Sequence, residues 1–187
     1  RGCDECISAL NEAVDALMAT PGMGAVQVSR GISLAARDHV KEQGAAGGKS
    51  HFSADRSDSA ARINKYGLWV GSEGEVIAFE TDDPRKIIIQ LVVDDGVPSR
   101  GHRKNLLSPE FKYAGVSIGY HKRLGTMCVI DLAGGYLSDD ADKDAILIKA
   151  VLLDEKEKVK ALLEAGGDSN TKDEKGQPLL IDAVIRG

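Results

Sequence analysis

The sequence predicts an α+β fold in which helices cover both sides of a sheet, an α/β/α sandwich with an all-α extension at its C-terminal end. Three observations predict it. Four segments have the apolar spacing or the end signals of helices. Three segments have the residue types of strands, and the helix over 84–94 separates the first strand from the other two. Beyond residue 138 the pattern becomes purely helical and rich in lysine and glutamate, which predicts a second unit.

The predicted helices cover 5–19, 30–43, 56–66 and 84–94. An apolar stripe at helical spacing indicates the first, and Pro21 with Gly22 ends it. Gly44 is the expected C-cap of the second. Asp83 and Pro84 form an N-cap and first-turn pair for the fourth.

The predicted strands cover 75–79, 114–118 and 126–133. β-Branched residues and flanking glycines indicate them, and the last two are close enough to form a hairpin. We therefore expect a first domain over 1–137 and a second over 138–187.

Composition excludes several classes of protein. The 187 residues include 24 Lys and Arg against 29 Asp and Glu, a net charge of −5, so the chain lacks the basic field that nucleic-acid binding requires. No apolar run approaches the ~20 residues of a transmembrane helix. The chain opens at Arg1 rather than Met, so we expect a processed product.

The three cysteines are Cys3, Cys6 and Cys128. They are too few for a disulfide scaffold, and the isolated CxxC is a weak zinc or redox signal because half of a four-ligand site is missing. The sequence leaves open one disulfide that involves Cys128, or none.

Several phrases in residues 30–136 resemble one family. The most specific runs from Asp94 to Leu106 (DDGVPSRGHRKNL). The others are Ala35–His39 (AARDH), Ser50-His51, Arg62-Ile63, Gly74–Ala78 (GEVIA), Phe111 with Gly115-Val116, and Gly125–Ile130 (GTMCVI). Together they resemble the CAP superfamily, which comprises cysteine-rich secretory, antigen 5 and pathogenesis-related proteins, and in particular its bacterial SCP-like branch.

This resemblance implies an α/β/α sandwich, secretion, and a cleft on one face of the sheet. The positions that match the family's cleft residues are His51, Glu75 and His102. In members that bind metal, two histidines meet in that cleft, so His51 and His102 are the expected ligands of a divalent ion such as zinc.

The residues themselves leave alternatives open. His51 and His102 both lie in polar, glycine-flanked loops, where they could anchor the loops, bind a metal with an acidic or solvent ligand, or act as an acid–base pair. Glu75 opens a predicted buried strand, so its carboxylate needs a partner.

Asp94 and Asp95 end a predicted helix, where the helix dipole disfavours negative charge. We expect Arg100 and Arg103 to pair with these aspartates and so form a structural clamp around the loop of His102. Outside the candidate cleft, His39 is expected in the core, whereas His121, in a turn rich in lysine and arginine, is expected in solvent.

Residues 144–187 resemble ankyrin repeats, through the phrases Leu162–Asn170 (LLEAGGDSN) and Gln177–Leu180 (QPLL). Leu147 and Pro178 are about one ~33-residue period apart, so about one and a third repeats are present. Because about three repeats are needed for stability, we expect the first domain to cap them and further repeats to follow Gly187.

These observations predict a secreted or periplasmic, non-enzymatic binding protein. Its ligand would be a lipid or other small molecule in the His/Glu cleft, with a divalent metal as an optional cofactor, and its ankyrin segment would bind a protein. The alternative is a peptidase-like hydrolase that uses His51, Glu75 and His102. No Gly-x-Ser-x-Gly elbow and no His-Glu-x-x-His motif is present to support that alternative.

Overall fold

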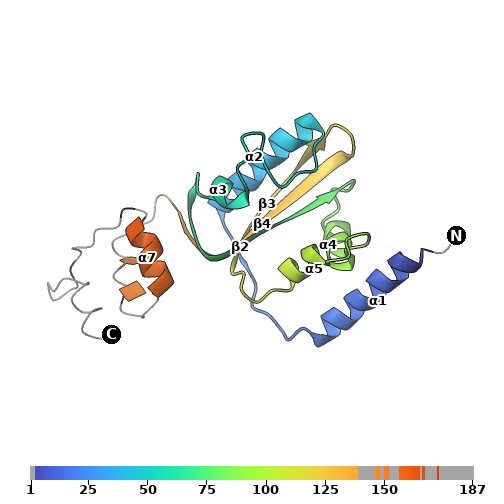
Figure 1. The fold of residues 1–187 in the computed structure, drawn as a ribbon, viewed down its shortest axis with the longest axis horizontal. Helices are drawn as coiled ribbons and strands as arrows, with labels where there is room; N and C mark the ends of the chain where they lie inside the picture. The colour runs from blue at the N-terminus through green and yellow to red at the C-terminus, as the bar shows by residue number, and fades with distance from the viewer. Residues whose placement is uncertain are drawn as a thin grey trace.

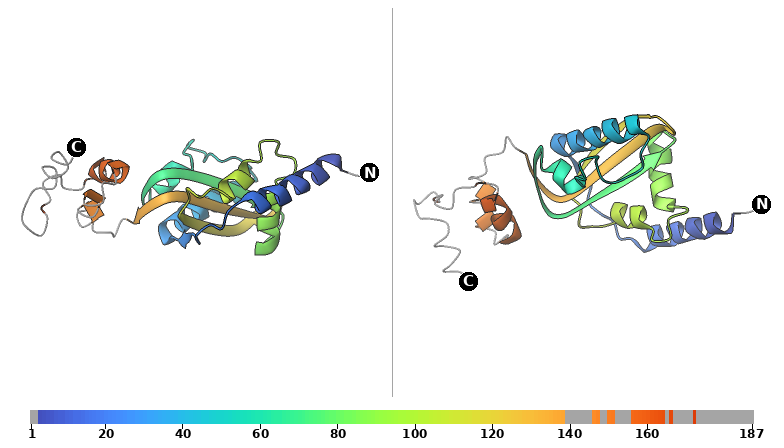
Figure 2. Two further views of the ribbon diagram at one scale, coloured as in Figure 1. Left: turned by 90° about the horizontal axis from the view of Figure 1, so that it is seen from below. Right: turned by 45° about the horizontal axis from the view of Figure 1, so that its top comes forward.

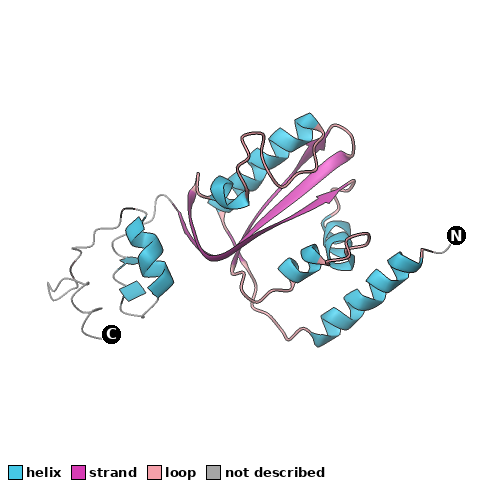
Figure 3. Cartoon of the chain, viewed as in Figure 1, coloured by secondary structure: helices cyan, strands magenta, loops and turns pink. Residues whose placement is uncertain are grey.

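A four-stranded sheet with helices on both faces forms the centre of the molecule in a computed structural model (Figures 1 and 3). The structure describes residues 3–138, 146–147, 150–151, 156–164, 166 and 172. The mixed α/β fold predicted from the sequence is confirmed.

All four predicted helices of the first domain are present, and one more is added. The helices are α1 (Asp4–Ala19), α2 (Arg30–Ala46), α3 (Ser59–Ile63), α4 (Pro84–Val93), the unpredicted α5 (Gly101–Leu106), and α7 (Lys156–Glu164) in the C-terminal segment. Asp83 caps α4 as expected, because its carboxylate accepts from the backbone N–H of Arg85 at 2.9 Å. The expected C-cap at Gly44 is wrong. Helix α2 continues to Ala46, and Gly47 ends it with a φ of 73°.

The sheet has the strand order β1-β3-β4-β2. Its strands are β1 (Gln27–Val28), β2 (Gly67–Phe79), β3 (Tyr113–His121) and β4 (Gly125–Ser138). The predicted hairpin is β3 with β4; β2 pairs antiparallel with β4, and the unpredicted β1 is parallel to β3. In this register Glu75 on β2 lies opposite Asp131 on β4.

Alternation along the strands gives the sheet two apolar faces. Val76 and Ala78 pack with Ile87 and Leu91 of α4, whereas Ile77 packs on the other face with residues of α2. Figure 2 shows the same layering, with α2 and α3 on one side of the strands and α4 and α5 on the other. Glu75 lies two residues before Ile77, so its side chain belongs to the face covered by α2 and α3.

Helix α2 approaches β3 closely because glycines lie where the two elements cross. A Cβ on Gly115 would lie 2.2 Å from the backbone carbon of Ile32, and one on Gly44 would lie 2.1 Å from the carbonyl oxygen of Tyr120. Side chains at these positions would push the helix off the sheet.

His121 corrects a prediction, because its side chain is fully buried rather than in solvent. Its Nε2 lies 2.8 Å from the carbonyl oxygen of Gly48, and its Nδ1 accepts from the backbone N–H groups of Arg123 and Leu124. The ring therefore fixes the β3–β4 turn. His39 is fully buried, as predicted.

Helix α1 lies against α4, at the opposite end of the molecule from α7 (Figure 1). Its buried residues are Ala9 and Ala13. The large apolar side chains of its stripe are instead about half exposed or more: Ile7, Leu10, Val14, Leu17 and Met18. Small side chains thus let α1 come close to the rest of the domain.

Most of the predicted ankyrin segment lies outside the described residues. Of the part that is described, Leu147, Ala150 and Leu162 form a buried cluster with Leu137 at the end of β4. Among the described residues, no helix is both long enough and apolar enough to cross a bilayer.

Candidate functional site

Two histidine–carboxylate pairs contain the predicted cleft residues. In the first pair, His51 Nδ1 lies 2.7 Å from Glu75 Oε1. The imidazole is 52% exposed and the Glu75 side chain only 3% exposed. The loop after α2 therefore brings an accessible imidazole to a buried carboxylate on β2.

Arg62 completes the surroundings of Glu75 from α3. Its guanidinium is 1% exposed and pairs with Glu75 Oε2. It also donates to the carbonyl oxygens of His51 at 3.0 Å and Ser57 at 3.3 Å. Burial alone would raise the pKa of Glu75, but the hydrogen bond with His51 and the charge of Arg62 outweigh it and lower that pKa below its ordinary value.

Asp131 is a member of this site that the sequence analysis missed. It is fully buried across the strand pair from Glu75, and Glu75 is the side chain with which its carboxyl group interacts. Burial, and then the negative charge of Glu75, raise the pKa of Asp131 well above its ordinary value. Glu75 and Asp131 therefore form an unequal pair, in which the protonated form is favoured at Asp131.

The second pair is His102 with Asp94. Asp94 ends α4 in the left-handed conformation, with a φ of 57°. One oxygen of its carboxylate accepts from the backbone N–H groups of His102 and Arg103, at 2.9 and 3.3 Å. The other oxygen lies 2.6 Å from His102 Nδ1. The Asp94 side chain is 1% exposed and the His102 side chain 24% exposed.

The two pairs share one chemical arrangement. In each, a buried carboxylate holds Nδ1, and within the described part of the chain Nε2 has no hydrogen-bond partner. A carboxylate on Nδ1 fixes the orientation and the tautomer of the ring, as it does for histidines that ligate metals. In both side chains Nε2 is therefore the atom available to contact a metal ion or a ligand.

The structure brings His51 and Glu75 together but leaves His102 in its own pair. Helix α5, which carries His102, lies on the sheet face opposite the Glu75 side chain. The link between them is Asn105 of α5, whose side-chain amide donates to the backbone carbonyl of Glu75 at 3.5 Å. Over the described residues, no trio of potential ligands within 4.8 Å of one another includes His51, Glu75 or His102.

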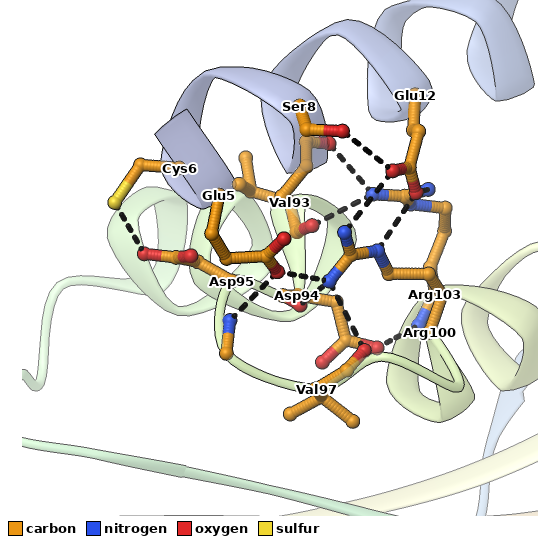
Figure 4. A network of polar contacts seen from close by, with 12 residues as sticks. Glu5, Cys6, Ser8, Glu12, Val93, Asp94, Asp95, Val97, Arg100 and Arg103 are labelled. Atoms are coloured by element: carbon orange, nitrogen blue, oxygen red, sulfur yellow. Dashed lines mark hydrogen bonds and ion pairs between the residues drawn. The ribbon is translucent and has the colours of Figure 1, made fainter. Parts of the chain in front are cut away.

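The predicted clamp has different partners from those expected. Arg100 pairs with Glu5 at 2.7 Å and Glu12 at 2.8 Å, both on α1, instead of with the aspartates. It also donates to the carbonyl oxygens of Asp94 and Val97 (Figure 4). The hydrogen bond with Arg100 lowers the pKa of Glu12 to about 2. Asp94 does not pair with the arginines because backbone N–H groups and His102 already occupy its carboxylate.

Arg103 also links α1 to the end of α4, by hydrogen bonds to backbone carbonyls. It donates to those of Val92 and Val93 at the end of α4, at 2.6 and 2.7 Å, and to that of Ala9 on α1 at 2.8 Å. The two arginines therefore fasten α1 to the loop that holds His102.

Neither arrangement expected for the cysteines, a disulfide that involves Cys128 or no disulfide, is present. Cys3 and Cys6 form a disulfide, and Cys128 is a free, buried thiol. Burial raises the pKa of Cys128 to about 11, so this thiol is unreactive in the folded core.

Comparison with known proteins agrees with this architecture. The sequence profile of the Cysteine-rich secretory protein family (CAP) matches residues 11–132. A comparison with curated protein sequences gave no match.

Two solved structures are similar to the chain. An outer surface protein from Borrelia burgdorferi has a TM-score of 0.51 and 15% identity, with 71% of this chain and 95% of that chain covered. An extracellular protein containing a SCP domain, from Bacillus anthracis str. Ames, has a TM-score of 0.47 and 21% identity, with 59% and 34% covered.

Proposed function

Because the chain belongs to the Cysteine-rich secretory protein family, we propose that it is an exported binding protein that offers the Nε2 atoms of His51 and His102 to its ligand. The observation that carries the proposal is the repeated pair, in which a buried carboxylate holds Nδ1 and leaves Nε2 without a described partner. The Cys3–Cys6 disulfide supports export, since disulfides persist in oxidising compartments.

A divalent metal such as zinc fits the donor chemistry of these histidines. Neutral imidazole is an ordinary zinc ligand, and a carboxylate behind the ring is its common support. Because the two histidines lie in separate pairs, each would hold its own ion, His51 with Glu75 as the support and His102 with Asp94 as the support. A bound ion would supply a positive charge for an anionic group of the ligand. Zinc sites usually have three or four ligands, so we expect water to complete the coordination and the affinity to be modest.

Zinc titration by calorimetry tests this proposal. The wild type should release or absorb binding heat, and His51→Ala and His102→Ala should each lose the part of that heat that comes from its own site. Glu110→Gln serves as the control, because it removes an exposed carboxylate that pairs with Ser72. Heats that are identical in the wild type and in both histidine variants would overturn the proposal.

The hydrolase alternative requires a nucleophile or an activated water beside one of the imidazoles. Within the described residues, no Ser, Thr or Cys side chain hydrogen-bonds His51 or His102. This favours binding over nucleophilic catalysis. Turnover of a peptide or ester panel that disappears in Glu75→Ala would reverse the preference.

Two further predictions concern the partners. A lipid or other small molecule as the ligand, and a protein partner for the ankyrin-like segment over 138–187, both stay predictions. Capture of a protein partner by the wild type that is lost on removal of 144–187 would support the second.

A further inference from the structure

The Cys3–Cys6 disulfide lies at the start of α1, outside both histidine pairs. Cys3 is the N-cap of the helix, and its sulfur accepts from the backbone N–H of Cys6 at 3.2 Å. Cys3 is exposed and Cys6 half-buried. The two sulfurs therefore differ in access and in their polar surroundings.

Asp95 adds a third chemical group to this place. Its Oδ2 lies 3.0 Å from the Cys6 sulfur (Figure 4). A sulfur in a disulfide carries no proton, so the approach is a contact here and becomes a hydrogen bond only when Cys6 is reduced to a thiol. Within the described residues, Cys3, Cys6 and Asp95 are the one trio of potential metal ligands whose donor atoms lie within 4.8 Å of one another.

Neighbouring polar contacts fix the positions of Asp95 and Cys6 relative to each other. Arg100 pairs with Glu5 of α1 and donates to the loop carbonyls of Asp94 and Val97. The backbone N–H of Gly96, next to Asp95, donates to Glu5 at 3.4 Å. The loop of Asp95 and the first turn of α1 are thus fastened together, which makes the contact a built feature of the fold.

We propose that Cys3, Cys6 and Asp95 form a thiol–disulfide exchange site, in which Cys3 is the attacking thiol, Cys6 the resolving thiol and Asp95 the proton acceptor of Cys6. The assignment follows from the surroundings of each sulfur. A thiolate at Cys3 would be stabilised by the N–H of Cys6 and by the start of the helix. At Cys6, the Asp95 carboxylate disfavours a thiolate and favours the thiol, which can donate to it.

Other charges near the two sulfurs set the pH at which Cys3 ionises. Asp4 and Glu5 lie in the first turn, and their negative charges oppose thiolate formation. Glu5 is compensated by its ion pair with Arg100. The remaining opposing charges are Asp4 and Asp95, and the Asp95 carboxylate lies 3.0 Å from the Cys6 sulfur and within 4.8 Å of the Cys3 sulfur.

The reaction balances with a small or protein disulfide, RSSR, as the oxidant. The Cys3 thiolate attacks one sulfur of RSSR, so the S–S bond of RSSR breaks, one RS⁻ leaves, and a mixed disulfide with Cys3 forms. Cys6 then gives its proton to Asp95 and attacks the Cys3 sulfur, which breaks the mixed disulfide and releases the second RS⁻. The two thiolates take up protons, one of them from Asp95, and the net change is protein dithiol plus RSSR to protein disulfide plus two RSH.

Reaction of the reduced full-length chain with glutathione disulfide, followed by mass spectrometry after acid quenching, tests the proposal. Cys6→Ser should trap a mixed disulfide at Cys3, whereas Cys3→Ser should form one at Cys6 at least about tenfold more slowly. Serine at position 3 is a good N-cap residue, and serine at position 6 is close in size to cysteine, so both variants should remain folded. Buried Cys128 should stay unmodified in each.

The function of Asp95 has its own test. In Asp95→Asn the mixed disulfide at Cys3 should last at least about tenfold longer than in the wild type, because Cys6 has lost its proton acceptor. Asp15→Asn, which changes an exposed aspartate of α1 away from the two sulfurs, is the matched control and should behave as the wild type. Equal rates for the two cysteine variants, or resolution at the wild-type rate in Asp95→Asn, would overturn the proposal.

Discussion

Replacement of Arg62 by methionine should be among the most damaging changes in this domain. The substitution removes the ion pair with Glu75 and leaves a carboxylate that is 3% exposed next to buried Asp131. Loss of one partner from a buried ion pair costs about 3–5 kcal/mol of the free energy of unfolding. We expect the low end, about 3 kcal/mol, because His51 still pairs with Glu75.

Urea denaturation at pH 7 measures this cost. With a dependence on urea of about 2 kcal/mol per molar, a loss of about 3 kcal/mol lowers the midpoint by about 1.5 M. Glu75→Gln in the Arg62→Met background should restore much of the loss, because it removes the unpaired charge. The control is Arg37→Met, which breaks an exposed pair of 3.6 Å and should cost less than about 1 kcal/mol. A single-variant loss below about 1 kcal/mol, or no recovery in the double variant, would refute the reasoning.

Three further changes test other parts of the fold. The stability of Asp131→Asn relative to the wild type should increase as the pH rises from about 4 to 7. The pKa of Asp131 is raised in the folded state, so the wild type loses stability as the pH rises through that pKa, and asparagine does not titrate. A stability difference that is constant with pH would contradict this. Gly115→Ala should lower the free energy of unfolding by about 1–3 kcal/mol through the clash with α2, whereas Gly22→Ala, which meets no atom within 4 Å, should change it by less than about 0.5 kcal/mol in the same urea titration. Removal of 144–187 should leave the main thermal transition by calorimetry in place, since the Leu147–Leu162 cluster is separate from the apolar layers of the sheet; loss of that transition would show that the boundary is misplaced.

Local patterns were enough to predict most of the fold. Apolar spacing predicted α1 and α2, and Asp83 with Pro84 predicted the start of α4. Helix α5 was missed because its six residues carry no apolar periodicity, and because Arg100 precedes it in a left-handed conformation that the sequence does not reveal.

The candidate site was less predictable, because its charges depend on contacts between distant segments. Arg62 reaches Glu75 only because α3 folds over β2, and the sequence alone did not suggest their pairing. Asp131 did leave a signal: it is a lone acid between Ile130 and Leu132 in an apolar strand, a position that is costly for a charge. Distance along the chain also explains why the partners of the clamp were predicted wrongly, because Arg100 pairs with Glu5 and Glu12, about ninety residues earlier.

The attachment of α1 differs in kind from that of the other helices. Helix α1 packs on the domain with alanines, and ion pairs of Arg100 and Arg103 with its glutamates attach it. Dissolved salt screens these ion pairs, so it weakens the attachment of α1 more than it weakens the apolar packing of the sheet. We therefore expect the packing of α1 on the domain to depend more on ionic strength than the packing of the sheet does.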